Sequence, residues 1–390
     1  MKILFVSAGY NPFSPKKGGS SQRSHLLLEA LAKVAQVDVA ICIGGVVSDI
    51  PNCQVVFSKN VDVWYHGFGN RKNKFKRLLR PWDPYSFFPL VPQAAKEMGK
   101  LIEEGNYDLI CTRYVETALT CGLMQYSSKL IVDVDDYPVD DMVKMSRMAP
   151  TLRSRVYYSL LSRAMRYSIN KTIRQCRYVY TPNRDLRINP RTSWLPNIPF
   201  YDCPTRNPIA IHDNPVILFV GGLSYMPNMQ GIGHFIKNVY PLVLDSVPNV
   251  RLHIVGRCND EEQKKEWESI SGITVKGYVD DIALEYYESD VCIAPVYAGA
   301  GTNIKVAEAL QMHRPCVVAP TAYRGYEMLE KGKDIVVADN DASYAEAIVD
   351  LLSDPEKRNA IADNGFEKYE QFFSRQAFMD VVKDSLQSLL

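Results

Sequence analysis

The 390-residue sequence contains no long hydrophobic run. No stretch approaches the roughly 18 consecutive apolar residues that a membrane-spanning helix needs. The first residues, MKILFVSAGYNP, hold one basic residue and only a short apolar run before Gly9, too little for a signal peptide. We therefore expect a cytoplasmic protein without a membrane span.

Cysteine and histidine are present, but not at functional spacings. The nine cysteines include no C-x-x-C pair, and four of them lie in apolar runs: Cys42, Cys111, Cys292 and Cys316. This pattern is typical of buried thiols in a reducing compartment. The six histidines lie far apart, and none has a carboxylate or cysteine at metal-ligand spacing. We expect no metal site and no resident cofactor.

The chain as a whole has almost no net charge, but each half does. The whole chain has a net charge of +1, with 46% hydrophobic and 23% charged residues, which is ordinary for a globular protein. Residues 1–213 hold 29 Lys and Arg against 18 Asp and Glu, a net charge of +11, whereas residues 214–390 hold 16 against 26, a net charge of −10. The near-neutral total is a cancellation between two oppositely charged halves.

Short apolar runs rich in β-branched residues alternate with longer helical patterns, which predicts βαβ units and parallel sheets. The predicted strands are 3–7, 37–43, 108–112, 130–134 and 178–181 in the first half, and 216–221, 252–256, 273–276, 291–295, 316–319 and 335–338 in the second. The sequence therefore predicts an α/β protein with two Rossmann-like doubly wound lobes facing a central cleft. Neither first-strand turn has G-x-G-x-x-G with an acidic residue about 20 positions later, which disfavours a dinucleotide oxidoreductase.

A proline-rich segment separates the two halves. PNIPFYDCPTRNPIAIHDNP contains five prolines in 20 residues, a density that stops helices and central strands. We predict a first lobe over 1–198, a linker over 199–215 and a second lobe over 216–372. We predict a final helix over 373–390. Its apolar stripe can pack on either lobe, and we expect the helix to cross back to the first lobe.

The most informative loop follows the predicted strand 291–295. Gly299 and Gly301 allow the backbone to approach a ligand closely, and a helix starting near Thr302 directs free N–H groups to the same point. Lys305, in the first turn, adds a positive charge for a diphosphate, and Glu308, one turn later, can accept hydrogen bonds from a ribose. The alternative is a glycine-rich capping turn with Lys305 solvated.

Two further glycine loops follow first strands. Gly222, in VGGLSYMPN, can place backbone amides against the same phosphates, although a tight strand-to-helix turn needs glycine anyway. Gly18 and Gly19 precede the helix through 25–32 and would meet the phosphates from the acceptor side. A flexible surface turn is an equal alternative.

A cluster of carboxylates ends the predicted strand 130–134. Strand ends in such sheets lie where ligands bind, so Asp135 and Asp136 are candidates for a catalytic role. Mutual repulsion would raise the pKa of at least one of them if the group is partly buried. The alternative is an ordinary solvated acidic loop.

The segment 71–82, RKNKFKRLLRPW, interleaves six Lys and Arg with Phe75, Leu78, Leu79 and Trp82. Such a stretch suits an anionic membrane surface, with shallow insertion of its apolar side chains. Nucleic acid would attract the same charges, but no recognised nucleic-acid motif accompanies them, so we expect no nucleic-acid partner. A solvated basic face is the remaining alternative.

These motifs together carry a resemblance. The sequence resembles family 4 glycosyltransferases of the GT-B fold, the glycosyl transferases group 1, and among them a subgroup associated with polysaccharide biosynthesis. The resemblance covers nearly the whole chain and is strongest over 214–340. It rests on Gly18-Gly19, Leu195-Pro-Asn197, FVGGLSYMPN, and the GAGTNIKVAEAL loop and helix through Pro315.

The resemblance implies a retaining, metal-independent transfer of a sugar from a nucleoside diphosphate sugar to a glycan or lipid-linked acceptor. It assigns the diphosphate to the backbone of Gly299, Ala300, Gly301 and Thr302 and to Lys305, and the ribose to Glu308. Arg257 is expected near the donor and assists Lys305. Tyr278 and Val279 are expected where the backbone contacts the base.

The chain departs from the family pattern at two positions. Many members have a glutamate at the position of Ala300 and a His-Asp pair where this chain has Asp135-Asp136. Asp135 cannot act as a neutral imidazole donor, so the sugar-stabilising role at that position is open. A sugar-nucleotide epimerase of the same fold and a non-catalytic nucleotide-sugar-binding protein are the alternative functions.

Overall fold

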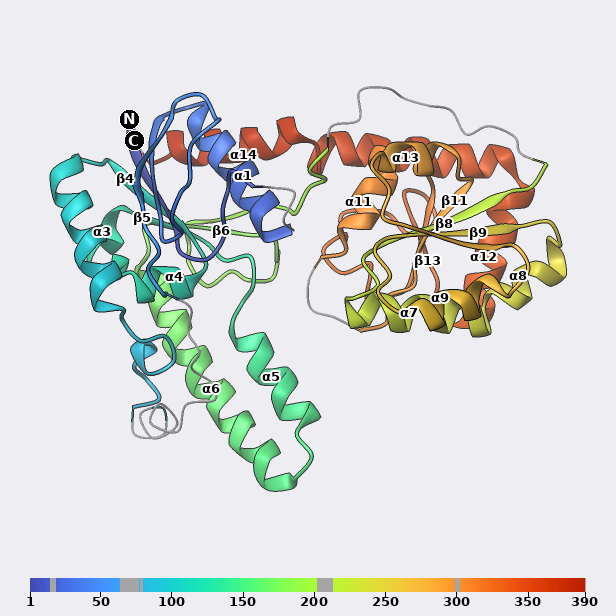
Figure 1. The fold of residues 1–390 in the computed structure, drawn as a ribbon, viewed down its shortest axis with the longest axis horizontal. Coiled ribbons are helices and arrows are strands. Elements are labelled where there is room, and N and C mark those ends of the chain that lie inside the picture. Colours follow the sequence, from blue (N-terminus) through green and yellow to red (C-terminus); the bar gives the residue numbers. More distant parts are fainter. Residues whose placement is uncertain (15–18, 64–76, 78–79, 202–212, 299–301, 390) are drawn as a thin grey trace. The chain divides into compact units, whose positions relative to one another are not determined.

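The structure is a computed structural model that describes residues 1–14, 19–63, 77, 80–201, 213–298 and 302–389. The described chain divides into two compact units, residues 1–196 with 379–390 and residues 197–378. Figure 1 shows a sheet flanked by helices in each unit. The predicted cleft between the units stays a prediction.

The first unit contains one seven-stranded parallel sheet in the order β3-β2-β1-β4-β5-β6-β7. Its strands are β1 (Lys2–Ser7), β2 (Gln36–Ile41), β3 (Cys53–Ser58), β4 (Leu109–Arg113), β5 (Leu130–Asp133), β6 (Tyr178–Thr181) and β7 (Thr192–Trp194). Its helices are α1 (Gly19–Ala32), α3 (Pro92–Gly105), α4 (Val115–Thr120), α5 (Val139–Met148) and α6 (Leu152–Gln175), with 3-10 turns η2 (Pro84–Ser86) and η3 (Leu123–Lys129).

The second unit repeats the scheme with a six-stranded parallel sheet in the order β10-β9-β8-β11-β12-β13. Its strands are β8 (Val216–Val220), β9 (Arg251–Val255), β10 (Ile273–Gly277), β11 (Val291–Ala294), β12 (Cys316–Val318) and β13 (Val336–Val337). Its helices are α7 (Met226–Asn238), α8 (Tyr240–Ser246), α9 (Glu261–Glu268), α10 (Ile282–Tyr287), α11 (Ile304–Gln311), α12 (Asp341–Ser353) and α13 (Pro355–Phe372). Helix α14 (Arg375–Gln387) contributes to both units.

All eleven predicted strands are present, and two further strands were missed. Strand β3 has only Phe57 fully buried, and the three residues of β7 are half-buried, because each strand lies at an edge of the sheet. Edge strands lack the continuous apolar run that marks a strand buried on both faces. The prediction that Gly19 lies in a loop is wrong, since α1 begins at Gly19.

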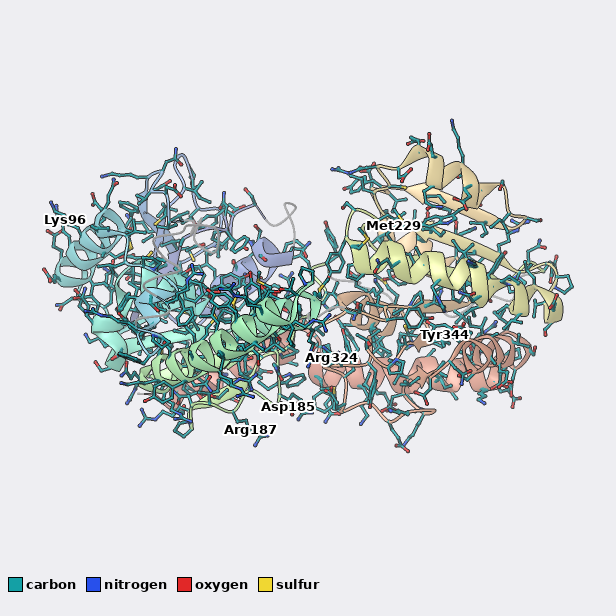
Figure 2. The ribbon with its side chains drawn as sticks, turned by 90° about the horizontal axis from the view of Figure 1, so that it is seen from below. Lys96, Asp185, Arg187, Met229, Arg324 and Tyr344 are labelled. Atoms are coloured by element: carbon teal, nitrogen blue, oxygen red, sulfur yellow. The ribbon has the colours of Figure 1, made fainter. Side chains whose placement is uncertain are left out.

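Each sheet is covered by helices that bury an apolar stripe. In the second unit, Tyr344 of α12 lies among the core side chains, where its ring packs edge-on against Phe235 and its hydroxyl donates to the Val317 carbonyl at 2.6 Å (Figure 2). In the first unit, α6 starts at a capping box in which Thr151 and Ser154 satisfy each other's backbone N–H groups.

Candidate functional site

Lys305 marks the candidate anion site of the second unit. It lies in the first turn of α11, just after the N-cap Asn303, and its side chain is buried. Its Nζ donates a 2.6 Å hydrogen bond to Oδ1 of Asn228 and lies 4.7 Å from the centre of the Phe219 ring. The prediction that Lys305 belongs to the first helical turn is confirmed. The alternative prediction, in which Lys305 is solvated, is wrong.

Asn228 connects the two glycine loops of this unit. It belongs to α7, and its Nδ2 donates a 3.0 Å hydrogen bond to the carbonyl of Gly222, in the loop after β8. Its Oδ1 holds Lys305, in the helix after β11, and β8 and β11 are neighbours in the sheet. Asn228 therefore fixes the ammonium group at the carboxyl ends of two adjacent strands.

Gly221, which precedes Gly222, has to be a glycine because the surrounding atoms leave no space for a side chain. A Cβ added at Gly221 would lie 2.7 Å from Asn228 Nδ2 and 3.1 Å from Lys305 Nζ. A Cβ at Gly256, whose φ is +146°, would lie 2.1 Å from the carbonyl oxygen of Gly221. The close packing of these backbones leaves no room for a side chain behind Lys305.

Burial perturbs both charged groups of α11. It lowers the pKa of Lys305 to about 8, against the opposing effect of Glu308. It raises the pKa of Glu308, whose Oε2 accepts a 3.0 Å hydrogen bond from the hydroxyl of Tyr286. Perturbed ionisable groups of this kind gather at functional sites, where desolvation strengthens their interaction with a ligand.

The other predicted donor residues follow strands of the same sheet. Thr302 is half-buried, Gly222 is exposed, and Arg257 is exposed with its carbonyl accepting from the N–H of Leu223. Tyr278, 69% exposed, and the half-buried Val279 follow β10, at the edge of the sheet. Gly299, Ala300 and Gly301 of the predicted cradle lie outside the described residues.

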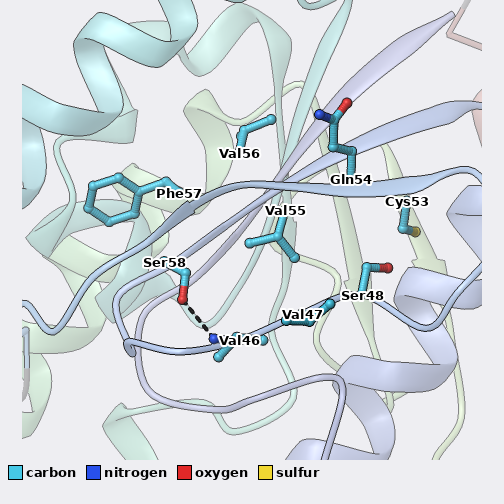
Figure 3. A pocket seen from close by; sticks show the side chains of 9 residues that line it. All are labelled: Val46, Val47, Ser48, Cys53, Gln54, Val55, Val56, Phe57 and Ser58. Atoms are coloured by element: carbon cyan, nitrogen blue, oxygen red, sulfur yellow. Dashed lines mark hydrogen bonds between the residues drawn. The ribbon is translucent and has the colours of Figure 1, made fainter.

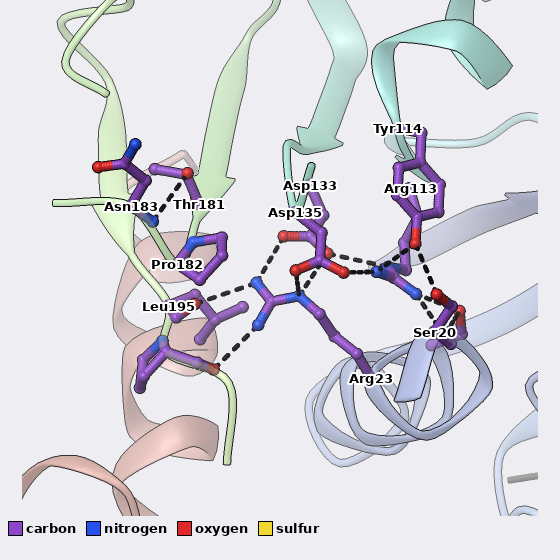
Figure 4. A network of polar contacts seen from close by, with 12 residues as sticks. Ser20, Arg23, Arg113, Tyr114, Asp133, Asp135, Thr181, Pro182, Asn183 and Leu195 are labelled. Carbon is purple, nitrogen blue, oxygen red and sulfur yellow. Dashed lines mark hydrogen bonds and ion pairs between the residues drawn. The ribbon is translucent and has the colours of Figure 1, made fainter. Parts of the chain in front are cut away.

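The first unit holds a buried ion-pair network at the ends of β4 and β5 (Figure 4). Asp133 is fully buried and accepts hydrogen bonds from Nε and Nη2 of Arg23 at 2.8 and 2.7 Å, and from Nε of Arg113 at 3.0 Å. Burial alone would raise the pKa of Asp133, but the two guanidinium groups hold it below its usual value. A carboxylate paired in this way stays ionised.

Asp135 lies at the edge of this network. It accepts a hydrogen bond from Nη2 of Arg113, and its Oδ1 lies 3.7 Å from Nε of Arg23. Its side chain is 14% exposed. Asp136 is exposed, and partial burial together with the charge of Asp135 raises its pKa. A fully solvated acidic loop is therefore wrong for Asp135.

The same arginines also form hydrogen bonds with other parts of the first unit. Arg23 donates to the carbonyls of Leu195 and Pro196, at 3.0 and 2.9 Å. Arg113 donates to Oγ of Ser24 at 2.9 Å and to the hydroxyl of Tyr114 at 3.0 Å. The network thus joins the start of α1, the end of β5 and the segment that leads to the second unit. Gly18 lies outside the described residues.

Sequence reasoning missed Arg23, Arg113, Tyr114 and Glu116. Arg113 ends a buried strand, which is close to the signal that singled out Asp135 and Asp136, and Arg23 is a charged residue that precedes the apolar run of α1. Glu116, in the first turn of α4, has an Oε2 without a hydrogen-bond partner, and burial raises its pKa to about 7. Tyr114 adopts a φ of +67°, uncommon for a non-glycine residue.

A cavity beside β3 does not contain any of the predicted site residues. A cavity of about 420 Å³ lies between β3 and residues 46–48, and none of the predicted residues line it (Figure 3). In the part of the chain that the structure describes, no three His, Cys, Asp or Glu side chains gather as metal ligands, and no helix is long and apolar enough to cross a membrane.

A family model and a protein of known sequence match this chain. The family model Glycosyl transferases group 1 matches residues 214–354. A protein of Klebsiella pneumoniae, described as an uncharacterized 44.6 kDa protein in the cps region, is 22% identical over 317 residues, which cover 78% of this chain and 80% of that protein.

Solved structures of similar fold cover almost the whole chain. Sucrose-phosphate synthase from Thermosynechococcus elongatus matches with a TM-score of 0.67 and 16% identity, over 100% of this chain and 98% of that one. HepE from Anabaena, solved in complex with UDP, matches with a TM-score of 0.63 and 16% identity over both full chains. WaaG, a glycosyltransferase involved in lipopolysaccharide biosynthesis, has a TM-score of 0.60 and 14% identity over 98% of each chain.

Proposed function

Since residues 214–354 match the family model Glycosyl transferases group 1 and the chain has the GT-B fold, we propose a retaining, metal-independent glycosyltransferase. It moves a sugar from a nucleoside diphosphate sugar to a glycan or lipid-linked acceptor in surface polysaccharide synthesis, on the cytoplasmic side of the membrane. The observation that carries the proposal is the buried Lys305, held by Asn228 at the start of α11.

The donor side of the proposal follows from electrostatics. A diphosphate at the start of α11 would meet the Lys305 ammonium and the unpaired N–H groups of a helix N-terminus. The second half of the chain carries a net charge of −10, so the attraction has to be local. Arg257 and the backbone of Thr302 complete the proposed phosphate contacts, and Glu308 binds the ribose.

The departing diphosphate gains negative charge as the glycosidic bond breaks, so a fixed positive group at this point lowers the barrier. Asp135 lies next to two arginines, an arrangement suited to accepting hydrogen bonds from the sugar or the acceptor. HepE binds UDP in its solved structure, which supports a uridine nucleotide as the first donor to test.

The Lys305→Ala variant tests the proposal. We expect transfer from a saturating nucleotide sugar to a membrane-extract acceptor to fall by about 100-fold or more, as when one preorganised contact is removed. Lys237→Ala, an exposed lysine on α7, is the matched control and should transfer at the wild-type rate. Full activity of the Lys305 variant would refute the assignment.

Two further measurements separate the alternatives. Incubation with labelled donor and no acceptor would release epimerised sugar if the protein were an epimerase, and none for a transferase. A non-catalytic sensor would bind donor without turnover even with acceptor present. Thermal shifts with UDP-, GDP- and other nucleotide sugars identify the donor, because a ligand at 100 times its dissociation constant stabilises a protein by about 2.7 kcal/mol.

A further inference from the structure

The carboxyl end of β5 carries negative charge inside a positively charged half of the chain. Residues 1–213 have a net charge of +11, but the segment 133–141 contains five aspartates and no Lys or Arg. These aspartates lie at the end of β5 and in the first turn of α5: Asp133, Asp135, Asp136, Asp140 and Asp141. Lys144 lies 3.1 Å from Asp141, an exposed ion pair of the kind that contributes little.

The two arginines of the network do not offer their positive charge to a ligand. A guanidinium group has five N–H donors. In Arg113 the three nitrogens form hydrogen bonds to five protein oxygens, which belong to Ser20, Ser24, Tyr114, Asp133 and Asp135 (Figure 4). The side chains of Arg113 and Arg23 are only 3% and 4% exposed. An anion at this strand end would therefore meet carboxylates before it met a guanidinium group.

Asp135 and Asp136 are the carboxylates that a ligand can reach. The side chain of Asp135 is 14% exposed although it is paired with Arg113, and Asp136 is exposed. A carboxylate accepts hydrogen bonds and donates none, and each of its oxygens has two lone pairs. Asp135 can therefore accept a hydrogen bond from a ligand hydroxyl while Arg113 holds the carboxylate in place.

Glu116 brings a further carboxyl group to the same place from the neighbouring strand. It follows β4 in the first turn of α4, and its Oε2 is buried and has no hydrogen-bond partner in the structure. Burial raises the pKa of Glu116 to about 7, and the charges of Asp136 and Asp141 add to this effect. A buried polar atom without a partner costs free energy. A hydroxyl-bearing ligand would supply the missing partner, whereas an anion would not.

The basic segment 71–82 does not alter this picture in the part of the chain that the structure describes. Arg77 is buried, and its Nε donates to the carbonyl of Ser86, so the alternative of a fully solvated basic face is wrong at this position. Residues 71–76 and 78–79 lie outside the described residues. The predicted contact of this segment with an anionic membrane surface stays a prediction.

We propose that the ends of β4 and β5 bind a neutral sugar residue of the acceptor and discriminate against a residue that carries a carboxylate or a phosphate. The hydroxyl groups of the neutral sugar donate hydrogen bonds to Asp135 and Asp136. An anionic residue would be repelled by these aspartates and by the two in the first turn of α5. The inference rests on the proposed function, since it names the chemical class of the acceptor in the proposed transfer.

Transfer to matched pairs of acceptors tests the proposal. The 4-nitrophenyl glycosides of glucose and galactose are compared with those of glucuronic and galacturonic acid, in which a carboxylate replaces the hydroxymethyl group, with the same saturating nucleotide sugar. We expect kcat/KM to be about tenfold higher for the neutral member of each pair, and this ratio to fall at high salt. Equal or preferred use of the acidic glycosides would overturn the proposal.

The double variant Asp140→Asn, Asp141→Asn tests the cause of the discrimination. Both positions are exposed, and the ratio compares two acceptors on one enzyme, so a general loss of activity cancels. We expect the ratio to fall by about threefold, because two of the repelling charges are gone. Glu103→Gln with Glu104→Gln, at exposed positions of α3, is the matched control and should keep the full ratio. An unchanged ratio in the α5 variant would contradict the electrostatic discrimination.

The pH dependence of the same ratio tests the part of Glu116. Its carboxyl group, which Asp136 and Asp141 influence, gains a negative charge as the pH rises through about 7. We therefore expect the ratio to be about twofold larger at pH 8 than at pH 6, and Glu116→Gln to remove this difference. The ionisation of Lys305 affects both acceptors equally and cancels. A ratio that is the same at both pH values would overturn the assignment of Glu116 to the site.

Binding without turnover separates this inference from the proposed activity. Saturation-transfer NMR with methyl glucoside and with the methyl glycoside of glucuronic acid measures the preference directly. Preference for methyl glucoside without any thermal shift by nucleotide sugars would contradict the proposed transferase and leave the sugar site standing. Nucleotide-sugar binding with no binding of either glycoside, or with preference for the acidic one, would overturn the sugar site and leave the proposed donor site standing.

Discussion

At the scale of single residues, burial of the Lys305 ammonium lowers the stability of the fold. Lys305 is buried, and desolvation of the ammonium lowers its pKa to about 8. The hydrogen bond from Lys305 to Asn228 and the nearby Phe219 ring offset only part of that cost. Desolvated charged groups of this kind are typical of functional sites.

The variant Lys305→Met should therefore stabilise the unliganded protein. In the native state the depressed pKa means that Lys305 costs stability below about pH 8, and the cost disappears as the pH rises above about 10.4, where lysine is neutral in the unfolded chain as well. Removal of the charge should raise the free energy of unfolding by about 1–3 kcal/mol at pH 7 and abolish transfer.

Urea unfolding of the wild type and Lys305→Met at pH 7 and pH 9 measures this effect. The gap in the free energy of unfolding should be larger at pH 7 than at pH 9. Lys237→Met, on an exposed position of α7, serves as the control and should show no gap. A less stable Lys305→Met variant at pH 7 would show that Asn228 and Phe219 outweigh the desolvation.

At the scale of elements, the site depends on how closely α7 approaches the end of β11. A Cβ added at Gly231 of α7 would lie 2.0 Å from the carbonyl oxygen of Pro295, which is backbone and cannot move aside cheaply. Since α7 carries Asn228, any displacement of this helix also moves the hydrogen-bond partner of Lys305.

We expect Gly231→Ala to destabilise the second unit and to weaken donor binding together. The steric conflict should lower the free energy of unfolding by roughly 1–3 kcal/mol, despite the higher helix propensity of alanine. Gly233→Ala is the matched control, because a Cβ there meets only the Trp267 ring at 3.7 Å, an ordinary contact. Thermal unfolding and nucleotide-sugar binding of the two variants show whether the helix propensity of alanine or the steric conflict with Pro295 has the larger effect.

At the scale of the whole molecule, the end of the chain belongs to the first unit. Met379, Val382 and Leu386 of α14 are buried, the hydroxyls of Tyr180 and Ser385 share a hydrogen bond, and Arg177 donates to the carbonyl of Leu389 at 3.1 Å. The start of the same helix serves the second unit, where Arg375 donates to the carbonyl of Phe200.

Deletion of residues 379–390 should therefore destabilise the first unit, although these residues follow the second unit in the sequence. Loss of three buried apolar side chains corresponds to roughly 4–9 kcal/mol. Differential scanning calorimetry should show an earlier transition in the truncated chain, while the transition that shifts with nucleotide sugar stays in place. The single variant Ser385→Ala, which removes one hydroxyl, should lower stability by only about 1 kcal/mol. Unchanged transitions would contradict the shared role of α14.

The sequence by itself determined the two parallel sheets, because buried parallel strands are near-continuous apolar runs, and it predicted Lys305 and Asp135 because both follow such strands. Only the tertiary structure decided what these residues contact. Asn228 holds Lys305 across 77 positions, and Arg23 holds Asp133 across 110. Side-chain pairs so far apart in sequence leave no local periodic signal, since only the order of the strands in the sheet brings their ends together.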